Sequence, residues 1–411
     1  MNTRYDILIV GGGMVGAAIA CALGGSNLKV AVLEASYPEA FDVSQPNDLR
    51  VSAISIASQN VLKMVGAWEG ILSRRSCQYK RMKVWESSED KAVTEFVSDN
   101  IGHDHLGHIV ENRVIQLSLL ERLKAFDNID LICPVTIEDI DYSPGSSIVK
   151  LADDTEVIGR LLIAADGGDS KVRQAAGIGV HKWDYEQHAL VASVTTNYEQ
   201  QDITWQQFTP TGPLAFLPLC GNNASLVWYN TPENVNRLMS MDDDSFMREL
   251  IATFPASLGS IDQLLARGSF PLRRQHAQNY IADGIALAGD SAHMIHPLAG
   301  QGVNIGLLDA AALAEVILKA ESEGSDWVSV STLQAYEKQR RLHNLLMMQT
   351  MDVFYRVFSN QNIPLKLVRN LGLGLAGKLI PAQNKVMQFA MGLEGPLPAL
   401  AKLEPICQAS S

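Results

Sequence analysis

Two glycine-rich turns, one near each end of the chain, carry residues that could bind phosphate. The first follows the apolar run Tyr5–Val10 and contains Gly11, Gly13, Met14, Val15 and Gly16. Glycines at this spacing between a strand and a helix let the backbone approach a pyrophosphate, which the free N–H groups at the helix start then bind. Glu34 ends the next apolar run, where a carboxylate can accept hydrogen bonds from a ribose. Strand, turn, helix, strand and acid follow in the required order, so we predict a nucleotide site.

The second turn, Gly289-Asp290, follows the apolar run Gly284–Ala288. Beyond it lies a rigid segment that contains Pro297, Gly300, Gln301 and Gly302. Backbone N–H groups of such a segment could meet a negative charge that develops on a flavin ring, so we predict a catalytic role for this backbone. Two phosphate-approaching turns in one domain indicate a long dinucleotide, gripped at its adenosine end by the first turn and at its ribityl end by the second. We therefore predict FAD as the cofactor.

The chemistry of two further features allows two interpretations each. Asp166-Gly167 follows the buried run Arg160–Ala165, and it is either part of the cofactor region or an ordinary strand-to-helix turn with an aspartate cap. Arg50 follows an extended loop, and it is either a surface cation or a residue that reaches the cofactor. Another Gly-x-Gly-x-x-Gly pattern at 372–377 has no strand before it, and we interpret it as a chance match or a helix-breaking turn.

No metal site is predicted. His293 and His296 have no acidic pair at ligand spacing, and the group His103, His105 and His108 lies in a Gly-rich stretch that we interpret as a solvated loop. Five scattered cysteines without Cys-x-x-Cys spacing are typical of a reduced, cytosolic chain. No side chain presents itself as a general base, and none is assigned.

The elements that must position these residues follow two patterns. Strands are predicted at 5–10, 29–34, 160–165 and 284–288, with a hairpin at 147–158. Helices are predicted at 14–23, 52–65, 114–126 and 303–319, and the chain after Ser331 is predicted to be helical to its end. Between 183 and 270, alternating segments separated by Pro and Gly turns indicate a mostly antiparallel sheet.

These patterns predict an α/β fold: a Rossmann-like FAD-binding domain, an inserted, mostly antiparallel β-sheet substrate domain, and a helical C-terminal region. The FAD-binding domain is predicted to be discontinuous, over 1–75, 98–180 and 275–330. The substrate domain is predicted over 76–97 and 181–274, and the C-terminal region over 331–411.

Composition limits the classes of partner. The 411 residues are 47% hydrophobic and 19% charged, and the net charge of −12 argues against nucleic-acid binding. Residues 331–411 differ from the rest, with nine Lys/Arg against four Asp/Glu. This basic, apolar region either contacts a membrane or partner, packs on the FAD domain, or forms a homo-oligomer interface. No signal peptide and no run long enough to span a membrane is found, so we predict a cytoplasmic protein.

The sequence resembles the class A flavoprotein aromatic hydroxylases, which have the para-hydroxybenzoate hydroxylase fold. Three signatures match in order: Gly11 to Gly16 with Glu34, Ala165 to Arg173, and Gly289 to His293 continued through Asn304. Within this family the chain is most similar to the ubiquinone-biosynthesis hydroxylases that act on a polyprenylated methyl-methoxy-benzoquinol. Segments that carry this likeness are Arg50–Ser55, Val110–Asn112, Trp205–Pro210, Ser225–Tyr229, Pro297–Asn304 and Arg369–Leu373.

The resemblance implies roles for individual residues. Gly11, Gly13, Gly16 and Glu34 would hold the ADP half of FAD, and Arg50 would reach the FAD as well. Asp290 would bind the ribityl region, and Asp166-Gly167 would belong to the cofactor region. The remaining implied contacts come from the second turn and the helix after it: Gly289, Gly302, Val303 and Asn304.

The resemblance also implies an activity. It is hydroxylation of a polyprenylated benzoquinol ring in ubiquinone biosynthesis, with NAD(P)H and O₂, through a flavin C4a-hydroperoxide. Implied partners are the quinol, O₂ and other ubiquinone-biosynthesis proteins, with a place at the inner membrane surface. Two alternatives stay open: a hydroxylase of another ring position or aromatic substrate, and a non-catalytic FAD-fold carrier or scaffold of the biosynthetic complex.

Overall fold

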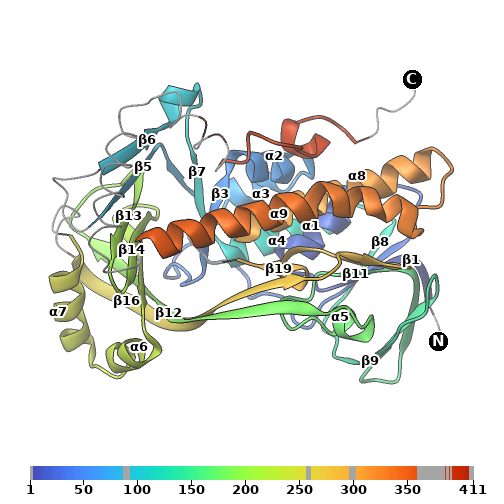
Figure 1. Cartoon of the computed structure of the whole chain (residues 1–411), viewed down its shortest axis with the longest axis horizontal. Coiled ribbons are helices and arrows are strands. Elements are labelled where there is room, and N and C mark those ends of the chain that lie inside the picture. The colour runs from blue at the N-terminus through green and yellow to red at the C-terminus, as the bar shows by residue number, and fades with distance from the viewer. Residues whose placement is uncertain are drawn as a thin grey trace.

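The computed structural model describes residues 3–86, 93–255, 261–295, 302–358, 385, 388 and 391–406, with the backbone alone at 185 and 351–358. A mixed sheet with a parallel centre lies at one end of the molecule and a mostly antiparallel sheet at the other (Figure 1). The first sheet contains β1 (Thr3–Val10), β2 (Val30–Leu33), β8 (Ile129–Ile132), β9 (Ile137–Asp141), β10 (Ser147–Leu151), β11 (Glu156–Ala164), β17 (Ile281–Ala282) and β18 (Ile285–Leu287).

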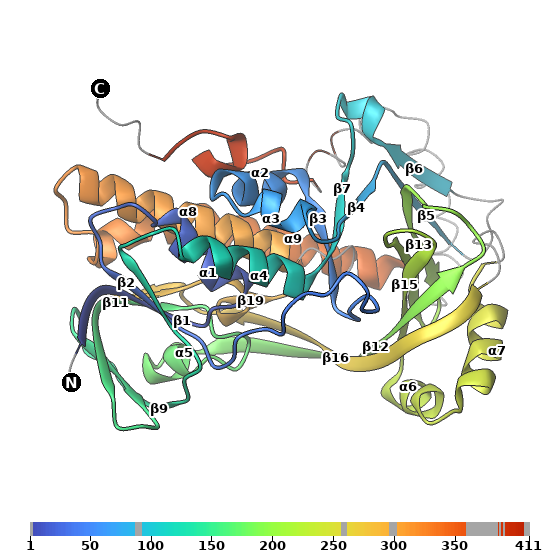
Figure 2. The same ribbon diagram turned by 180° about the vertical axis from the view of Figure 1, so that it is seen from behind.

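The centre of the first sheet is parallel, in the order β18-β11-β1-β2-β8. Ile7, Leu8 and Ile9 of β1 have no exposed surface, as expected for a strand covered on both faces. Helices cover one face of this sheet (Figures 1 and 2), and they include α1 (Met14–Ala22), α4 (Asn112–Leu123) and α8 (Gly302–Ser322).

The second sheet has the order β19-β16-β12-β15-β14-β13-β5-β6. Its strands are β5 (Arg81–Glu86), β6 (Val93–Val97), β12 (Val180–Thr196), β13 (Ile203–Thr209), β14 (Gly212–Pro218), β15 (Asn223–Asn230), β16 (Ile261–Ala277) and β19 (His293–Met294). Its pairs are antiparallel except for β13 with β5. The long strands β12 and β16 run side by side from the second sheet toward the first (Figure 2).

A small third sheet, β3 (Val51–Ser55), β7 (Gly107–Glu111) and β4 (Cys77–Tyr79), lies between the larger sheets. The remaining helices are α2 (Ile56–Met64), α3 (Trp68–Leu72), α5 (Lys171–Ala175), α6 (Pro232–Met239), α7 (Asp243–Thr253) and α9 (Val330–Phe358), with 3₁₀ turns η1 (Ser98–Ile101), η3 (Gly289–Ser291) and η5 (Ala399–Lys402). Helix α9 packs along α8 and extends toward the second sheet (Figure 1).

The predicted fold class is confirmed, with corrections to single elements. The helix predicted at 52–65 is wrong in its first part, because Val51–Ser55 pairs with β7 as a strand. Ser55 then ends this strand, and its side chain caps α2 by accepting a hydrogen bond from the N–H of Ser58. The hairpin arm and the strand predicted at 160–165 are one continuous strand, β11.

Two further differences concern helices. Helices α6 and α7 were not predicted within the antiparallel region, although Thr231 and Asp242 cap their first turns. The helix predicted after Ser331 is confirmed to Phe358, whereas 391–406 forms turns with one short 3₁₀ segment. The stretch between them, including the glycine pattern at 372–377, lies outside the described residues. The predicted domain boundaries stay a prediction.

Candidate active site

A cavity of about 420 Å³ lies where the two large sheets meet. It brings together residues that are hundreds of positions apart in the sequence. Residues predicted from the sequence that line it are Gly13, Met14, Val15, Arg50, Gly167, Asp290, Gly302 and Val303. The rest of its wall comes largely from the second sheet. A volume of this size is typical of a small-molecule site.

The positions of the first turn require glycine for different physical reasons. Gly11 has φ +100°, and a Cβ there would lie 2.3 Å from the carbonyl oxygen of Ala165. A Cβ at Gly16 would lie 1.9 Å from the carbonyl oxygen of Gly11. These two positions therefore need glycine so that α1 can pack on the sheet.

Gly13 is different because its conformation suits any residue. Its φ is −67°, and a Cβ there would meet nothing within 4 Å. Gly13 lines the cavity and is the N-cap of α1, but no side chain caps this helix. An open approach to uncapped backbone N–H groups is the cradle that a pyrophosphate needs, so these residues fit FAD.

Glu34 lies beside the same turn. Its carboxylate accepts hydrogen bonds from the N–H of Gly12 at 2.6 Å and from the N–H of Ser36 at 3.1 Å. The acid is therefore held against the glycine backbone at the end of β2. Its contact with a ribose stays a prediction.

Two predicted residues, Asp166 and Gly289, shape the backbone around the cavity. Asp166 accepts hydrogen bonds from the N–H groups of Lys171 and Val172 and from the hydroxyl of Ser291. Asp166 therefore binds the first N–H groups of α5, whose N-cap is Ser170, and ties this turn to the second one. Its place in the cofactor region stays a prediction. Gly289 has φ +60° and stands at the start of η3.

Asn304 is buried and bonds to strand β3. Its side chain donates to the carbonyl oxygen of Ala53 at 2.8 Å and accepts from the N–H of Ser55 at 2.9 Å. These bonds tie the start of α8 to β3, and a cofactor contact of Asn304 stays a prediction. Of the predicted flavin-side segment, Pro297, Gly300 and Gln301 lie outside the described residues. Gly302 begins α8 at the cavity, with open space where its Cβ would be.

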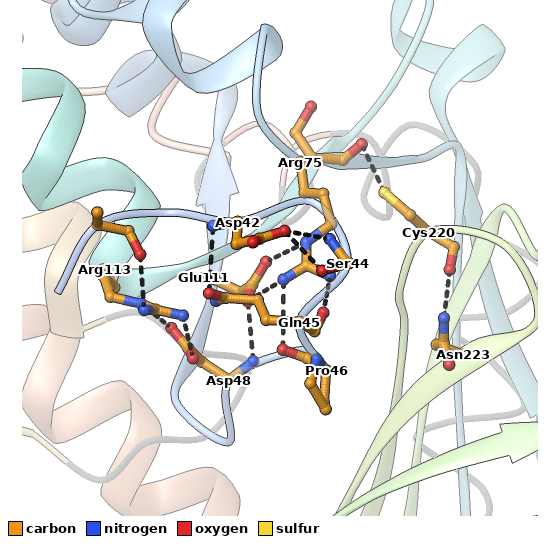
Figure 3. A network of polar contacts seen from close by, with 12 residues as sticks. Asp42, Ser44, Gln45, Pro46, Asp48, Arg75, Glu111, Arg113, Cys220 and Asn223 are labelled. Atoms are coloured by element: carbon orange, nitrogen blue, oxygen red, sulfur yellow. Dashed lines mark hydrogen bonds and ion pairs between the residues drawn. The ribbon is translucent and has the colours of Figure 1, made fainter.

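Arg50 follows a loop that ion pairs hold in place (Figure 3). Asp48 pairs with Arg113 through two hydrogen bonds of 2.8 and 2.9 Å. The N–H of Asp48 also donates to the buried carboxylate of Glu111, which forms an ion pair with Arg75 at 3.0 Å. Sequence reasoning missed these partners, because they come from β7, α4 and the segment before β4. They place Arg50 at the cavity, with its guanidinium 5.7 Å from the ring centre of Phe270.

A buried carboxylate, Asp309 of α8, supports the second turn. It accepts hydrogen bonds from the N–H of Gly289 at 3.2 Å, from Nε2 of His293 at 2.5 Å and from Nε of Arg340 at 2.8 Å. Asn344 donates to it as well, at 3.0 Å. Asp309, Arg340 and Asn344 have no exposed surface. Arg340 and Asn344 belong to α9, so this cluster also fastens α9 to the cofactor region.

Partners decide the ionisation state of Asp309. Burial alone would raise the pKa of Asp309, but the charges of His293 and Arg340 and the hydrogen bonds hold it well below its usual range. Because this pKa is lowered on folding, the stabilisation is present above the ordinary carboxylate pKa and is lost only when the pH falls through the lower folded value. In the sequence, this buried carboxylate could have been recognised only as a lone acid inside the apolar stretch of α8.

The histidine group at 103–108 differs from the predicted solvated loop. His108 lies in β7 with 7% of its surface exposed, and its ring lies 4.7 Å from that of His105. Nε2 of His105 bonds to Oε1 of Gln59 at 2.6 Å. Burial lowers the pKa of His108 to about 4, so it is neutral at physiological pH. Within the described ranges, no group of three or more His, Cys, Asp or Glu residues is arranged to hold a metal ion.

The contrast between Gly13 and Gly11 gives a test of the first turn. Gly13→Val should leave the apoprotein folded, because the new side chain points into open space, and should abolish FAD retention by occupying the space of the pyrophosphate. Gly11→Val should lower apoprotein stability itself, because of its positive φ and the clash with Ala165. Flavin absorbance and apoprotein melting temperature measure both effects. A Gly13→Val protein that stays fully yellow would sink the assignment.

The Asp309 cluster gives a second prediction. Asp309→Ala should lower the free energy of unfolding by about 3–5 kcal/mol, because it leaves the buried Arg340 without its carboxylate. Glu249→Ala is the control, since its pair with Arg237 at 3.4 Å is about half exposed, and should cost less than about 1 kcal/mol. Denaturant unfolding measures both variants. Equal losses of unfolding free energy in the two variants would show that the buried cluster stabilises the protein no more than an exposed ion pair.

Comparisons with known proteins agree with this geometry. A protein family described as FAD binding domain matches residues 135–351, just over half of the chain. The chain is 41% identical to the 3-demethoxyubiquinol 3-hydroxylase of Escherichia coli, over 95% of this chain and 100% of that protein. It is 36% identical to the mitochondrial ubiquinone biosynthesis monooxygenase COQ6 of Xenopus tropicalis, over 94% and 93%, and 35% identical to the ubiquinone hydroxylase UbiL of Rhodospirillum rubrum, over 94% and 89%.

A solved structure shares the fold. The p-nitrophenol 4-monooxygenase PnpA of Pseudomonas putida superposes with a TM-score of 0.78 over 96% of this chain and 99% of that chain, at 18% identity. At this identity the likeness concerns the fold alone. The relatives at 35–41% identity, matched along nearly their whole length, define the family. The chain therefore belongs to the FAD-dependent monooxygenases that include the ubiquinone-biosynthesis hydroxylases.

Proposed function

We propose that this protein hydroxylates the ring of a polyprenylated benzoquinol in ubiquinone biosynthesis, with FAD as its cofactor and NAD(P)H as the reductant. NAD(P)H supplies two electrons, one atom of O₂ enters a ring C–H bond as a hydroxyl, and the other leaves as water. The observation that carries the proposal is the shared cavity. The glycine turn at Gly13, the Asp290 turn and the apolar face of the second sheet all open into it.

The chain's own residues would bind and orient the FAD and shield the reacting ring from water. The backbone at Gly13 would receive the pyrophosphate, and the 289–290 turn, braced by Asp309, would receive the ribityl side. Bound FAD would supply the oxygen-transfer chemistry, which side chains cannot perform. The apolar wall, with Val191, Leu217 and Val227, would keep water away from the reacting ring.

The ionisable groups of the cavity fit a substrate that needs no strong base. Among the described residues that line it, the charged ones are Arg50, Arg273 and Asp290, and the phenols are Tyr79 and Tyr229. Burial raises the pKa of both phenols, so they remain protonated at neutral pH. A benzoquinol is already electron-rich through its two hydroxyls. This match supports a quinol over a substrate that must first be deprotonated.

A direct experiment is turnover by the purified protein. Addition of a short-chain benzoquinol with one free ring position should accelerate NAD(P)H oxidation and yield one hydroxylated product per NAD(P)H consumed. The matched control is the same quinol with every ring position substituted, which can bind but has no C–H bond to hydroxylate. NAD(P)H oxidation without any hydroxylated product from the first compound would contradict the proposal.

We further propose that α9 contacts the membrane from which such a substrate would come. Leu342 and Leu346 lie one turn apart on α9 and are 72% and 51% exposed. Residues 331–411 carry an excess of Lys/Arg over Asp/Glu, which favours an anionic lipid surface. In the described part of the chain, no helix is long and apolar enough to cross a bilayer.

This proposal predicts the behaviour of a double variant. Leu342→Gln with Leu346→Gln should reduce binding to vesicles of phosphatidylglycerol and phosphatidylcholine about 10-fold or more, because two apolar side chains no longer enter the interface. Ile251→Gln is the control, since Ile251 is 52% exposed on α7. Co-sedimentation measures binding, and flavin absorbance checks that FAD is retained. Unchanged binding by the double variant would exclude this face of α9.

A further inference from the structure

The second sheet uses its two faces differently. On one face, Phe216, Leu226 and Trp228 pack in a hydrophobic cluster with Phe246 and Phe254 of the α7 region. The opposite face forms a wall of the cavity. Because side chains alternate along a strand, the residues between those of the first face belong to the cavity face.

The cavity face is apolar over most of its area. Val191, Leu217, Val227 and Phe270 form its greater part. A wall of this kind suits a ring and an alkyl chain, but by itself it does not determine which ring carbon faces the flavin. That orientation requires polar groups at defined points.

Polar side chains interrupt this wall, among them Gln206 of β13 and Ser225 of β15. Nε2 of Gln206 and Oγ of Ser225 are buried, and neither has a hydrogen-bond partner within the described structure. The neighbouring Thr204, also on the wall, is different, because its hydroxyl donates to the carbonyl oxygen of Phe216 at 2.8 Å. A polar atom that is buried without a partner costs stability. The cost at both positions is removed if each side chain turns toward a bound molecule that completes its hydrogen bonds.

The spacing of the two side chains fits one aromatic ring. Gln206 pairs with Ala215 of β14, which pairs with Val227 of β15, and Ser225 lies two residues from Val227 on the same face. Strand spacing and rise per residue then place the two Cα atoms about 12 Å apart. That distance accommodates a ring with oxygen substituents on opposite sides and a hydrogen bond of about 2.8 Å at each oxygen.

We propose that Gln206 and Ser225 are the specificity-determining pair of the ring site. The amide of Gln206 donates to one ring oxygen, and the hydroxyl of Ser225 bonds to the oxygen on the other side. Together they fix the rotation of the ring against the mostly apolar wall of the second sheet, and so select the carbon that is presented for hydroxylation. This inference rests on the proposed function, because it names the groups that recognise the substrate of the same cavity.

The test measures ligand binding and stability together. The holoenzyme without NAD(P)H is titrated with a short-chain dimethoxy-methyl-benzoquinone, and the flavin absorbance change reports the Kd. Gln206→Leu and Ser225→Ala should each weaken binding about 5–10-fold, which is the effect of one uncharged hydrogen bond. Both should keep or raise the melting temperature of the ligand-free holoenzyme, because each removes an unpaired buried polar atom.

Ser193→Ala is the matched control. Ser193 pairs directly with Ser225 across β12 and β15, and its hydroxyl is also buried without a partner in the described structure, but it does not line the cavity. This variant should resemble Ser225→Ala in stability and leave the Kd unchanged. A purely structural role for the pair would instead lower the melting temperature of Gln206→Leu and Ser225→Ala.

A second ligand distinguishes the two positions. With a monophenol that lacks one of the two ring oxygens, the wild type should bind less tightly, and the variant that served the missing oxygen should lose nothing further. If the wild type binds the ligand and the Kd changes less than twofold in both variants, the role of Gln206 and Ser225 is overturned and the proposed function stays intact. No response of the wild type to either ligand would contradict the proposed function itself.

Discussion

A carboxylate without exposed surface must be neutralised by groups that are equally buried, and Asp309 imposes this requirement on the structure. Its four partners come from three different places: the second glycine turn, β19 and α9. Satisfying the charge therefore fixes the backbone of the Gly289-Asp290 turn relative to α8. It also fixes α9, whose Tyr336 donates a hydrogen bond to the carbonyl oxygen of Leu287, just before that turn. The cofactor region and the C-terminal helix are consequently one packed unit.

A second requirement is that the apolar wall of the second sheet face the turns at Gly13 and Asp290. The long strands β12 and β16 provide this orientation. Their paired register extends from Val180 and Ala277, near the first sheet, to Thr196 and Ile261 at the far end. Strands of this length leave the orientation of the second sheet little freedom. Helices α6 and α7 occupy one face (Figure 2). The other face is left for the cavity. A ring bound there would lie between an apolar wall and the Gly13 and Asp290 turns, with the loop before Arg50 held by Asp48 and Glu111.

Local patterns in the sequence predicted the parts of the fold whose partners are close in the chain. The turn between β1 and α1 was predictable because its glycines, helix and acid lie within one βαβ unit. Strand β3 was mistaken for helix because its partner β7 lies far along the chain, and pairing overrides the local periodicity. The same limit applies to the site. Asp309 could be noticed as a lone acid in an apolar helix, but its partners from α9 could not. Gln206 and Ser225 stand out only when α6 and α7, which were not predicted, show which face of the sheet remains open.

The most direct test of the account is the quinone content of a host from which this gene has been deleted. Mass spectrometry of lipid extracts should show a polyprenylated benzoquinol that lacks one ring hydroxyl, together with a fall in the final quinone. Return of the wild-type gene should reverse both changes, and return of the gene encoding Gly13→Val should not. An unchanged quinone profile in the deletion strain would contradict the claim that this FAD-dependent monooxygenase acts on a ubiquinone precursor.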